Sequence, residues 1–374
     1  MAHQKPVLSG KRGRITRVLS RHGADSRKAR HIAGSSQEDK NSTSEASFAP
    51  IRNMPKSTNI AVAGGSGGIG RYVVEGLLAL KASRCPHLHI IVLSRSIGDD
   101  ISFHGSSAQM IQVDYDDKEA LTLLFRLHRI DTIICTLVNH DLTQFSALQE
   151  KVLRAALDVS SFRRFAPSEF GVDSEALKTY NYYACKLPIL DVLRSVKSTH
   201  PDFEWTKFVP GVFTNYLAFG NSKPAGEKAL EHLRKMTIRV DISTRAADIP
   251  GDGTAKQFYT VAEDVGTFVA EATQLDAWPE QLDMAGDEIS LNEVISIAEK
   301  VTGKKFDVKH NTKEDILEAM NQPPKEWKDY YYLAQLSIIL EEVGQGKTLN
   351  GLVPHFKPTT VEEFIRKWWG ASDK

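Results

Sequence analysis

The sequence predicts an α/β protein in which helices wind around both faces of a parallel sheet and a smaller lobe follows at the C-terminus. From Asn59 onward, short apolar runs alternate with longer amphipathic runs, which is typical of repeated strand–helix units. A glycine-rich turn at residues 64–70 joins the first of these strands to the first helix. Beyond residue 210 the pattern becomes less regular and richer in Pro and Gly, which favours a separate lobe.

The predicted elements follow one another along the chain. We expect helices at residues 69–80, 117–127, 144–157 and 179–196, and strands at residues 60–63, 88–93, 109–113, 131–136, 163–166 and 205–209. Two later helices are expected to begin at Ser290 and Thr360, because each hydroxyl stands three residues before a glutamate, the spacing of a capping box.

Residues 1–56 are predicted to lie outside the folded part of the chain. They combine many basic side chains with a Ser/Thr-rich tract and offer few large apolar residues to bury. Three origins fit this composition: a mitochondrial transit peptide, a flexible tail, or a true translation start at Met54 rather than Met1. The basic arm lacks the interleaved aromatic residues of a nucleic-acid binder, so we expect no nucleic-acid partner.

Composition excludes several classes of function. The 374 residues contain 47 Lys and Arg against 47 Asp and Glu, so no general attraction to a polyanion is expected. Cys85, Cys135 and Cys185 are far apart, which predicts a reducing compartment and no metal site. No apolar run approaches the roughly 20 residues that cross a bilayer. We therefore expect a soluble cytoplasmic protein that acts as a monomer or homodimer. It would be mitochondrial if the N-terminal residues are a genuine transit peptide.

The glycine-rich turn predicts a dinucleotide site of the Rossmann type. It lies between a strand and a helix, where glycines permit a tight turn and a close approach of the backbone to a pyrophosphate at the helix N-terminus. The alternative is a mere glycine-rich turn. The residues expected to bind the cofactor here are Gly64, Gly65, Ser66, Gly67, Gly68, Ile69 and Gly70. We accordingly assign residues 57–210 to an NAD(P)-binding domain and residues 211–374 mainly to a substrate-binding lobe with elements that return to the sheet.

The end of the second strand indicates which dinucleotide is bound. Ser94 and Arg95 stand where a protein that prefers NAD usually places a carboxylate for the ribose hydroxyl. A guanidinium instead forms paired hydrogen bonds to a 2′-phosphate, so Arg95, assisted by Ser94, predicts NADPH. The alternative is a solvated surface arginine. Asp114 ends the next strand, where it either contacts adenine or only caps a turn.

The candidate reactive groups follow the fifth strand. Ser168 is expected to face the nicotinamide from the carboxyl edge of the sheet. Tyr182 and Lys186 are four residues apart and would share one face of a helix, as in short-chain dehydrogenases. Lys186 is predicted to transfer the proton or to bind the ribose as a cation, the alternative being a solvated helix lysine. Pro188 would bend this helix unless a new helix begins there.

Several motifs together carry a resemblance to a known family, over roughly residues 57–370. They are the glycine turn, Arg95, Gln149, the Pro-Ser-Glu-Phe-Gly run within residues 164–171, and the segments 183–186, 210–213 and 356–360. In these the chain resembles the isoflavone reductase and NmrA-like group of atypical short-chain dehydrogenases. That group includes phenylcoumaran benzylic ether and pinoresinol–lariciresinol reductases.

The resemblance implies roles for particular residues. It places the catalytic lysine at Lys186, without a tyrosine partner, and a substrate-pocket phenylalanine at Phe213. The chain departs from the plant members at Ser66, where they usually have Thr, and at Tyr183, where they usually have Phe. Phe170 is also expected to line the substrate pocket. Thr136 and Tyr216 stand near predicted strand ends and are further candidates, with plain packing as the alternative for each.

Two functions fit these expectations. The first is an NADPH-dependent reductase that transfers hydride to an aromatic or conjugated small molecule, with Lys186 as general acid/base assisted by Ser168 or Tyr182. The second is a regulatory protein of the NmrA type, which senses a dinucleotide without turnover. The resemblance implies that such sensors generally lack the lysine, so Lys186 favours the enzyme.

Overall fold

The computed structural model describes residues 56–179, 181–223, 226–321, 328–340 and 345–370. The first element begins at Asn59, and the predicted N-terminal extension lies outside the described residues except for Lys56. Within these ranges, no helix has both the length and the apolar character needed to cross a membrane.

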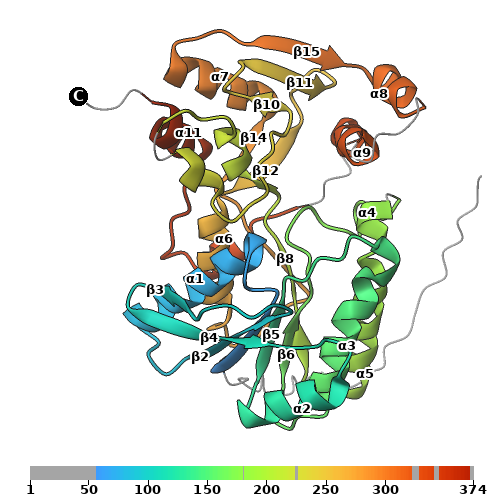
Figure 1. Ribbon diagram of the computed structural model, residues 1–374. Helices are drawn as coiled ribbons and strands as arrows, with labels where there is room; N and C mark the ends of the chain where they lie inside the picture. Colours follow the sequence, from blue (N-terminus) through green and yellow to red (C-terminus); the bar gives the residue numbers. More distant parts are fainter. Residues whose placement is uncertain (1–55, 180, 224–225, 322–327, 341–344, 371–374) are drawn as a thin grey trace, which may run out of the picture. The chain divides into compact units, whose positions relative to one another are not determined.

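The largest sheet of the described chain is a seven-stranded one with the order β3-β4-β2-β1-β5-β6-β7 (Figure 1). Neighbouring strands are parallel except for the short hairpin of β3 and β4, which the sequence did not predict. The strand order reverses on either side of β1, and open α/β sheets bind ligands at such a reversal. The strands are β1 (Asn59–Ala63), β2 (His89–Ser94), β3 (Ile101–Phe103), β4 (Ser106–Gln112), β5 (Thr132–Cys135), β6 (Arg164–Ala166) and β7 (Glu204–Trp205).

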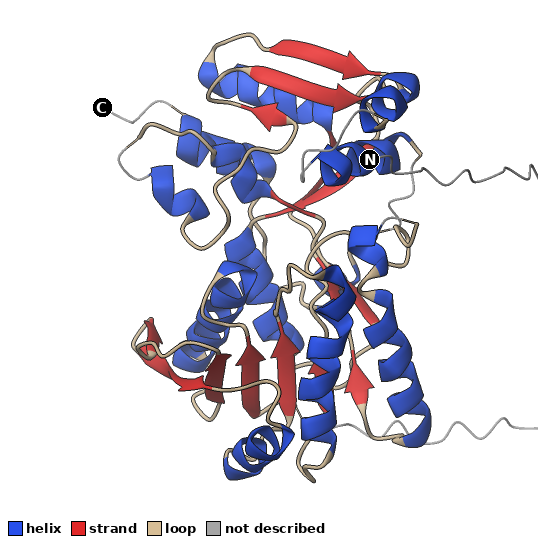
Figure 2. Cartoon of the chain, turned by 45° about the vertical axis from the view of Figure 1, so that its right-hand side comes forward, coloured by secondary structure: helices blue, strands red, loops and turns tan. Residues whose placement is uncertain are grey.

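Helices cover both faces of this sheet, as predicted (Figures 1 and 2). Along β1, Ile60 and Val62 join one apolar cluster while Ala61 and Ala63 join another, because successive side chains of a strand point to opposite faces. The first cluster includes residues of α1 and α6, and the second includes residues of α2, α3 and α5. The bounds are α1 (Gly68–Ser83), α2 (Lys118–Leu127), α3 (Phe145–Leu157), α5 (Leu187–Thr199) and α6 (Ala262–Ala272).

Two of the predicted elements are wrong. The helix expected at residues 179–196 is divided into α4 (Asn181–Ala184) and α5, with Pro188 in the first turn of the second helix. A new helix therefore begins where the proline would have bent a continuous one. The strand expected at residues 205–209 is interrupted at Thr206. Its first part, β7, pairs with β6, whereas β8 (Lys207–Val209) pairs with β13 (Gln281–Asp283) of a different sheet.

The C-terminal part contains a third apolar cluster and two small sheets, with orders β10-β11-β15 and β14-β12-β9. Both predicted capping boxes are confirmed, at Ser290 for α7 (Leu291–Thr302) and at Thr360 for α11 (Val361–Trp369). The other elements are β9 (Val212–Phe213), β10 (Val240–Asp241), β11 (Ala246–Pro250), β12 (Lys256–Thr260), β14 (Asp287–Ser290), β15 (Asp307–Asn311), α8 (Lys313–Met320), α9 (Lys328–Ile339) and α10 (Thr348–Leu352).

Helix α6, from the C-terminal half of the chain, packs directly against α1, the helix that follows the glycine-rich turn. A Cβ at Gly76 of α1 would lie 2.2 Å from the carbonyl oxygen of Gly266 in α6, so the two backbones are in close contact.

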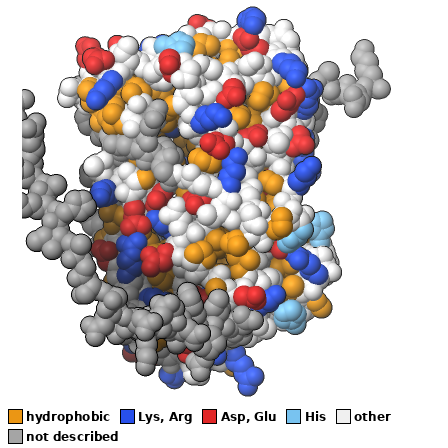
Figure 3. Space-filling model, turned by 180° about the vertical axis from the view of Figure 1, so that it is seen from behind, with side chains coloured by type: hydrophobic (Ala, Val, Ile, Leu, Met, Phe, Trp, Pro, Cys, Tyr) orange, Lys and Arg blue, Asp and Glu red, His pale blue; other side chains and the backbone are white. Residues whose placement is uncertain are grey.

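On the face drawn in Figure 3, acidic and basic side chains are interspersed, in keeping with the zero net charge.

Candidate functional site

The predicted cofactor and catalytic residues meet at one edge of the large sheet. The glycine turn follows β1, Arg95 follows β2, Asp114 lies beyond β4, Thr136 follows β5 and Ser168 lies beyond β6. These strands are parallel neighbours, so their carboxyl ends lie along the same edge. This is the edge at which open α/β folds bind their ligands.

The glycine turn leaves its backbone open to a ligand. Gly64 has a φ of +84°, which favours glycine, and a Cβ at Gly70 would lie 2.3 Å from Thr136 Oγ1. By contrast, Gly67 and Gly68 are exposed, and an added Cβ would meet no atom within 4 Å at either position. No side chain caps the start of α1 and no acidic residue occupies its first turn. The turn therefore presents a helix N-terminus that suits a phosphate.

The residues after β2 and β4 shape exposed turns. Arg95 is exposed, and its carbonyl oxygen accepts a hydrogen bond from Gln112 Nε2 at 3.1 Å. Ser94 is buried, and its Oγ accepts a hydrogen bond from the backbone of Ser96 at 3.1 Å. Asp114 Oδ1 accepts the backbone N–H of Asp116 at 2.9 Å, so this carboxylate does cap a turn, and the adenine contact stays a prediction. An exposed guanidinium after β2, the strand that pairs with β1, is suited to a 2′-phosphate.

The loop that carries Ser168 is held from several sides. The backbone N–H of Ser168 donates to Gln149 Oε1 at 2.7 Å, from the buried side of α3. Phe170 donates its backbone N–H to the Phe208 carbonyl at 3.1 Å, and its φ of +39° is unusual for a residue other than glycine. The Glu169 carboxylate accepts the backbone N–H of Ser174 at 2.6 Å. These bonds fix the loop against both α3 and β8.

Lys186 lies inside this loop rather than in solvent. Its side chain is only 8% exposed, and Nζ donates to the carbonyl oxygen of Glu169. The carboxylate of the same Glu169 is 3.9 Å from Nζ, and the Tyr183 ring centroid is 5.8 Å away. The alternative of a solvated helix lysine is therefore wrong. A buried ammonium needs such partners to offset the loss of water.

Tyr182 and Lys186 do not share a helical face, so that prediction is wrong. Tyr182 belongs to the short α4, whereas Lys186 lies beyond its end as the N-cap of α5. Tyr182 is 44% exposed, and it is Tyr183 that packs against the ammonium. A role for Tyr182 in proton transfer stays a prediction, and the two residues do not form the tyrosine–lysine pair of a single helix.

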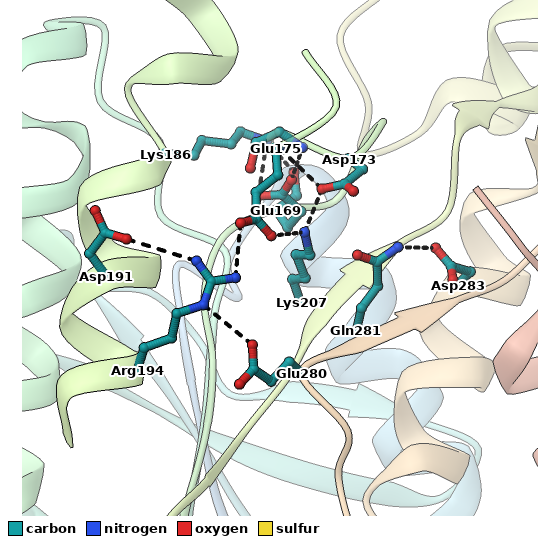
Figure 4. Close-up of polar contacts among 11 residues, drawn as sticks. Glu169, Asp173, Glu175, Lys186, Asp191, Arg194, Lys207, Glu280, Gln281 and Asp283 are labelled. Carbon is teal, nitrogen blue, oxygen red and sulfur yellow. Dashed lines mark hydrogen bonds and ion pairs between the residues drawn. The ribbon is translucent and has the colours of Figure 1, made fainter. Parts of the chain in front are cut away.

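A second buried lysine fixes the far end of the same loop (Figure 4). Lys207 of β8 is 2% exposed, and its ammonium bonds to Asp173 and, at 2.6 Å, to Glu175. Burial opposes the charge of Lys207, but the hydrogen bonds to the two carboxylates outweigh it and raise the pKa of Lys207. Arg194 of α5 bonds to Glu175 at 2.9 Å, so α5 is joined to the same network.

Aromatic side chains also pack near the start of α1, the helix that follows the glycine turn. Phe213 is partly buried in an apolar group that also contains Ile69 of the turn and Tyr72 of α1, and its ring centroid is 6.2 Å from that of Tyr216. Phe170 belongs to the main core cluster, against which Phe213 and Ile69 also pack, and its ring centroid is 6.0 Å from that of Phe208. Thr136 donates its hydroxyl to the Ala63 carbonyl at 2.9 Å. Both predicted substrate residues therefore lie in apolar groups that include Ile69 of the glycine turn, and their contact with a substrate stays a prediction.

The sequence analysis did not assign a supporting role to three residues that build this site: Ser146, Gln149 and Glu169. Ser146 and Gln149 are buried and three positions apart on α3. Polar side chains on the buried face of an amphipathic helix were the available signal, because such groups need hydrogen-bond partners. In the described part of the chain, no group of three or more His, Cys, Asp or Glu side chains could hold a metal ion.

Known proteins resemble this chain over most of its length. The model of the NmrA-like family matches residues 56–365. Oxidoreductase BOA1 of Botryotinia fuckeliana (strain B05.10) is 32% identical over 247 residues, which are 66% of this chain and 77% of that protein. Bifunctional pinoresinol-lariciresinol reductase 2 of Thuja plicata is 23% identical over 346 residues, with 84% of this chain and 100% of the relative covered.

The fold also matches solved structures. The binary complex of leucoanthocyanidin reductase with NADPH from Vitis vinifera superposes with a TM-score of 0.62 at 19% identity, over 83% of this chain and 98% of that one. At this identity the match concerns the fold, which is the Rossmann-type α/β architecture predicted from the sequence.

Proposed function

The chain belongs to the NmrA-like family, and from this premise we propose that it is an NADPH-dependent reductase of an aromatic or conjugated small molecule. Membership confirms the resemblance drawn from the sequence. The observation that carries the proposal is Lys186, a buried ammonium held by Glu169 at the carboxyl edge of the sheet. The names of the relatives, oxidoreductase and pinoresinol-lariciresinol reductase, support the same reaction class.

The cofactor proposal rests on the glycine turn and Arg95. The open N-terminus of α1 would hold the pyrophosphate, and the exposed Arg95 guanidinium would bind the 2′-phosphate. In the sequence of the described loops after β2, no carboxylate stands directly beside Arg95 to repel that phosphate. The similar leucoanthocyanidin reductase was solved with NADPH, which supports this choice of dinucleotide.

Lys186 would act on the proton. Bound NADPH would supply the hydride. The Lys186 ammonium would then stabilise and protonate the substrate atom that gains negative charge. For this step the ammonium would have to leave the Glu169 carbonyl and bond to the substrate instead. Ser168, on the loop fixed by Gln149, would orient the substrate, and Tyr182 would assist from the exposed side of α4. Phe213 would contact an aromatic ring beside the glycine turn.

One observation favours a second function, a sensor that binds the dinucleotide without turnover. Lys186 is buried, and its ammonium already has a carbonyl partner within the protein, so a substrate must displace that partner before any proton is transferred. A protein in which this contact never opens would bind NADPH and catalyse nothing. The same fold serves both functions.

The experiment is to titrate the full chain with NADPH and NADH and then to follow cofactor oxidation with a panel of aromatic enones, quinones and benzylic ethers. The proposal predicts tighter binding of NADPH than of NADH and oxidation with at least one class of the panel. Tight NADPH binding with no turnover on any of them would favour the sensor. Equal affinity for the two dinucleotides would contradict the role of Arg95.

A further inference from the structure

The junction between α4 and α5 is stabilised by a residue of another helix. Ser146 lies in the first turn of α3 and is buried. Its hydroxyl donates to the carbonyl oxygen of Cys185 at 2.6 Å, and its Oγ accepts the backbone N–H of Ile189 at 3.3 Å. One side chain thus bonds to the residue just before Lys186 and to a residue three positions after it.

This contact replaces a cap that the chain does not supply locally. Lys186 is the N-cap of α5, but its side chain makes no capping hydrogen bond. An N-cap side chain normally accepts the backbone N–H of the second or third helical residue, and Ile189 is the third residue of α5. Ser146 therefore caps α5 from α3. The Lys186 side chain is left to extend toward Glu169 instead.

From this geometry we propose that Ser146 is a positioning residue for Lys186. Ser146 holds the Cys185 carbonyl before Lys186 and the first turn of α5 after it. The direction of the lysine side chain therefore depends on Ser146. Gln149, three residues later on α3, holds the backbone of Ser168. Two polar residues on the buried face of α3 thus support Lys186 and Ser168. The consequence for turnover rests on the proposed function, whereas the position of the ammonium does not.

The test that needs no substrate is competitive acetylation of the full chain with trace acetic anhydride, followed by mass spectrometry across a range of pH. Lys304, which is exposed, serves as the internal reference. In Ser146→Ala the junction loosens, and acetylation of Lys186 relative to Lys304 rises about fivefold, the factor that corresponds to one capping hydrogen bond. Ser146→Thr keeps the hydroxyl and retains the wild-type profile.

The matched control is Thr122→Val. Thr122 is also buried and donates its hydroxyl to a backbone carbonyl of α3, that of Ala155, at 3.0 Å. This variant loses one buried hydrogen bond at α3 but leaves the junction at Lys186 intact. The proposal is overturned if Ser146→Ala leaves the labelling of Lys186 unchanged, or if Thr122→Val raises it equally. If Ser146→Ala does not fold, Ser146→Cys takes its place and must raise the labelling.

A second readout applies once a substrate is known. Ser146→Ala lowers kcat about 10- to 100-fold, as expected for a misplaced catalytic group, while KM for NADPH changes by less than about threefold. Ser146→Thr restores kcat. If none of the substrates in the panel supports NADPH oxidation by the wild-type chain, the proposed function fails. The labelling result still decides the role of Ser146 in that case. An unchanged kcat in Ser146→Ala overturns the catalytic part of the inference.

Discussion

Lys186 shows how an ammonium group is held inside the protein. Its ammonium is shielded from water, where an unpaired charge is costly. The Glu169 carbonyl and carboxylate and the Tyr183 ring each contribute a favourable interaction with the cation. These partners orient the side chain, and under the proposed function a substrate oxygen at the same place would replace the carbonyl as acceptor.

At the residue scale, Arg95→Glu is expected to change the choice of dinucleotide. The variant replaces a donor to the 2′-phosphate with a like charge, so the Kd for NADPH rises about 100-fold, as expected for the loss of charged hydrogen bonds. NADH has no 2′-phosphate and should lose much less affinity. Fluorescence titration with both dinucleotides measures the two changes.

Lys304→Glu is the control for this variant, because it makes the same change of charge at an exposed residue of the C-terminal part. It should leave both Kd values near those of the wild type. If Arg95→Glu weakens NADPH and NADH equally, Arg95 does not recognise the 2′-phosphate.

At the element scale, the start of α1 depends on which glycine is replaced. Gly70→Ala places a Cβ 2.3 Å from Thr136 Oγ1 and 2.5 Å from the Gly64 carbonyl. The expected loss is about 1 to 3 kcal/mol in the free energy of unfolding, the usual result of overpacking. Gly67→Ala is the matched control, because no atom lies within 4 Å of its added Cβ and its φ is −162°.

Chemical denaturation of the three proteins measures these differences. Gly67→Ala should lose less than about 1 kcal/mol, the scale of a change at an uncharged N-cap. A Gly70→Ala variant as stable as Gly67→Ala would show that the turn is not as tightly packed as described.

The elements differ in how far local sequence determines them. The capping boxes at Ser290 and Thr360 were predictable because a hydroxyl and a glutamate three residues apart satisfy each other's backbone groups. A third box, at Thr312 and Asp315, was not predicted, since aspartate takes the place of the glutamate. The break at Thr206 was not predictable either, because a continuous apolar run does not reveal which sheet each half joins.

At the scale of the whole molecule, the candidate site also has one part that could be predicted from the sequence and one part that could not. Its cofactor side was predictable, because parallel strands bring their carboxyl ends to one edge and the glycine turn follows the first of them. Its catalytic side required tertiary structure. The pairing of Lys207 with Asp173, and the contact of Ser146 with residues 185 and 189, join segments whose proximity no local pattern encodes.

The C-terminal segment is coupled to the cofactor side through Asp264, in the first turn of α6. Its carboxylate accepts the backbone N–H of Thr359 at 2.6 Å, and α6 packs against α1. Burial raises the pKa of Asp264 to about 6, although the Thr359 hydrogen bond lowers it. The protonated form is therefore favoured by the folded state. Its contribution to stability is full below about pH 4 and is lost as the pH rises through about 6.

Asp264→Asn should remove this dependence, because the amide does not titrate. Between about pH 4 and pH 7, the free energy of unfolding of the variant should rise relative to the wild type by about 2 kcal/mol. Urea denaturation at several pH values measures that difference. A difference between the two proteins that does not change with pH would contradict the raised pKa.

The most direct test of the central claim is the turnover of Lys186→Ala, measured as NADPH oxidation with the best substrate of the panel. Loss of the general acid should lower kcat at least about 100-fold, while the Kd for NADPH stays within about tenfold of the wild-type value. Lys304→Ala, at an exposed position, should turn over like the wild type. Wild-type kcat in Lys186→Ala would remove this lysine from the mechanism and contradict the account.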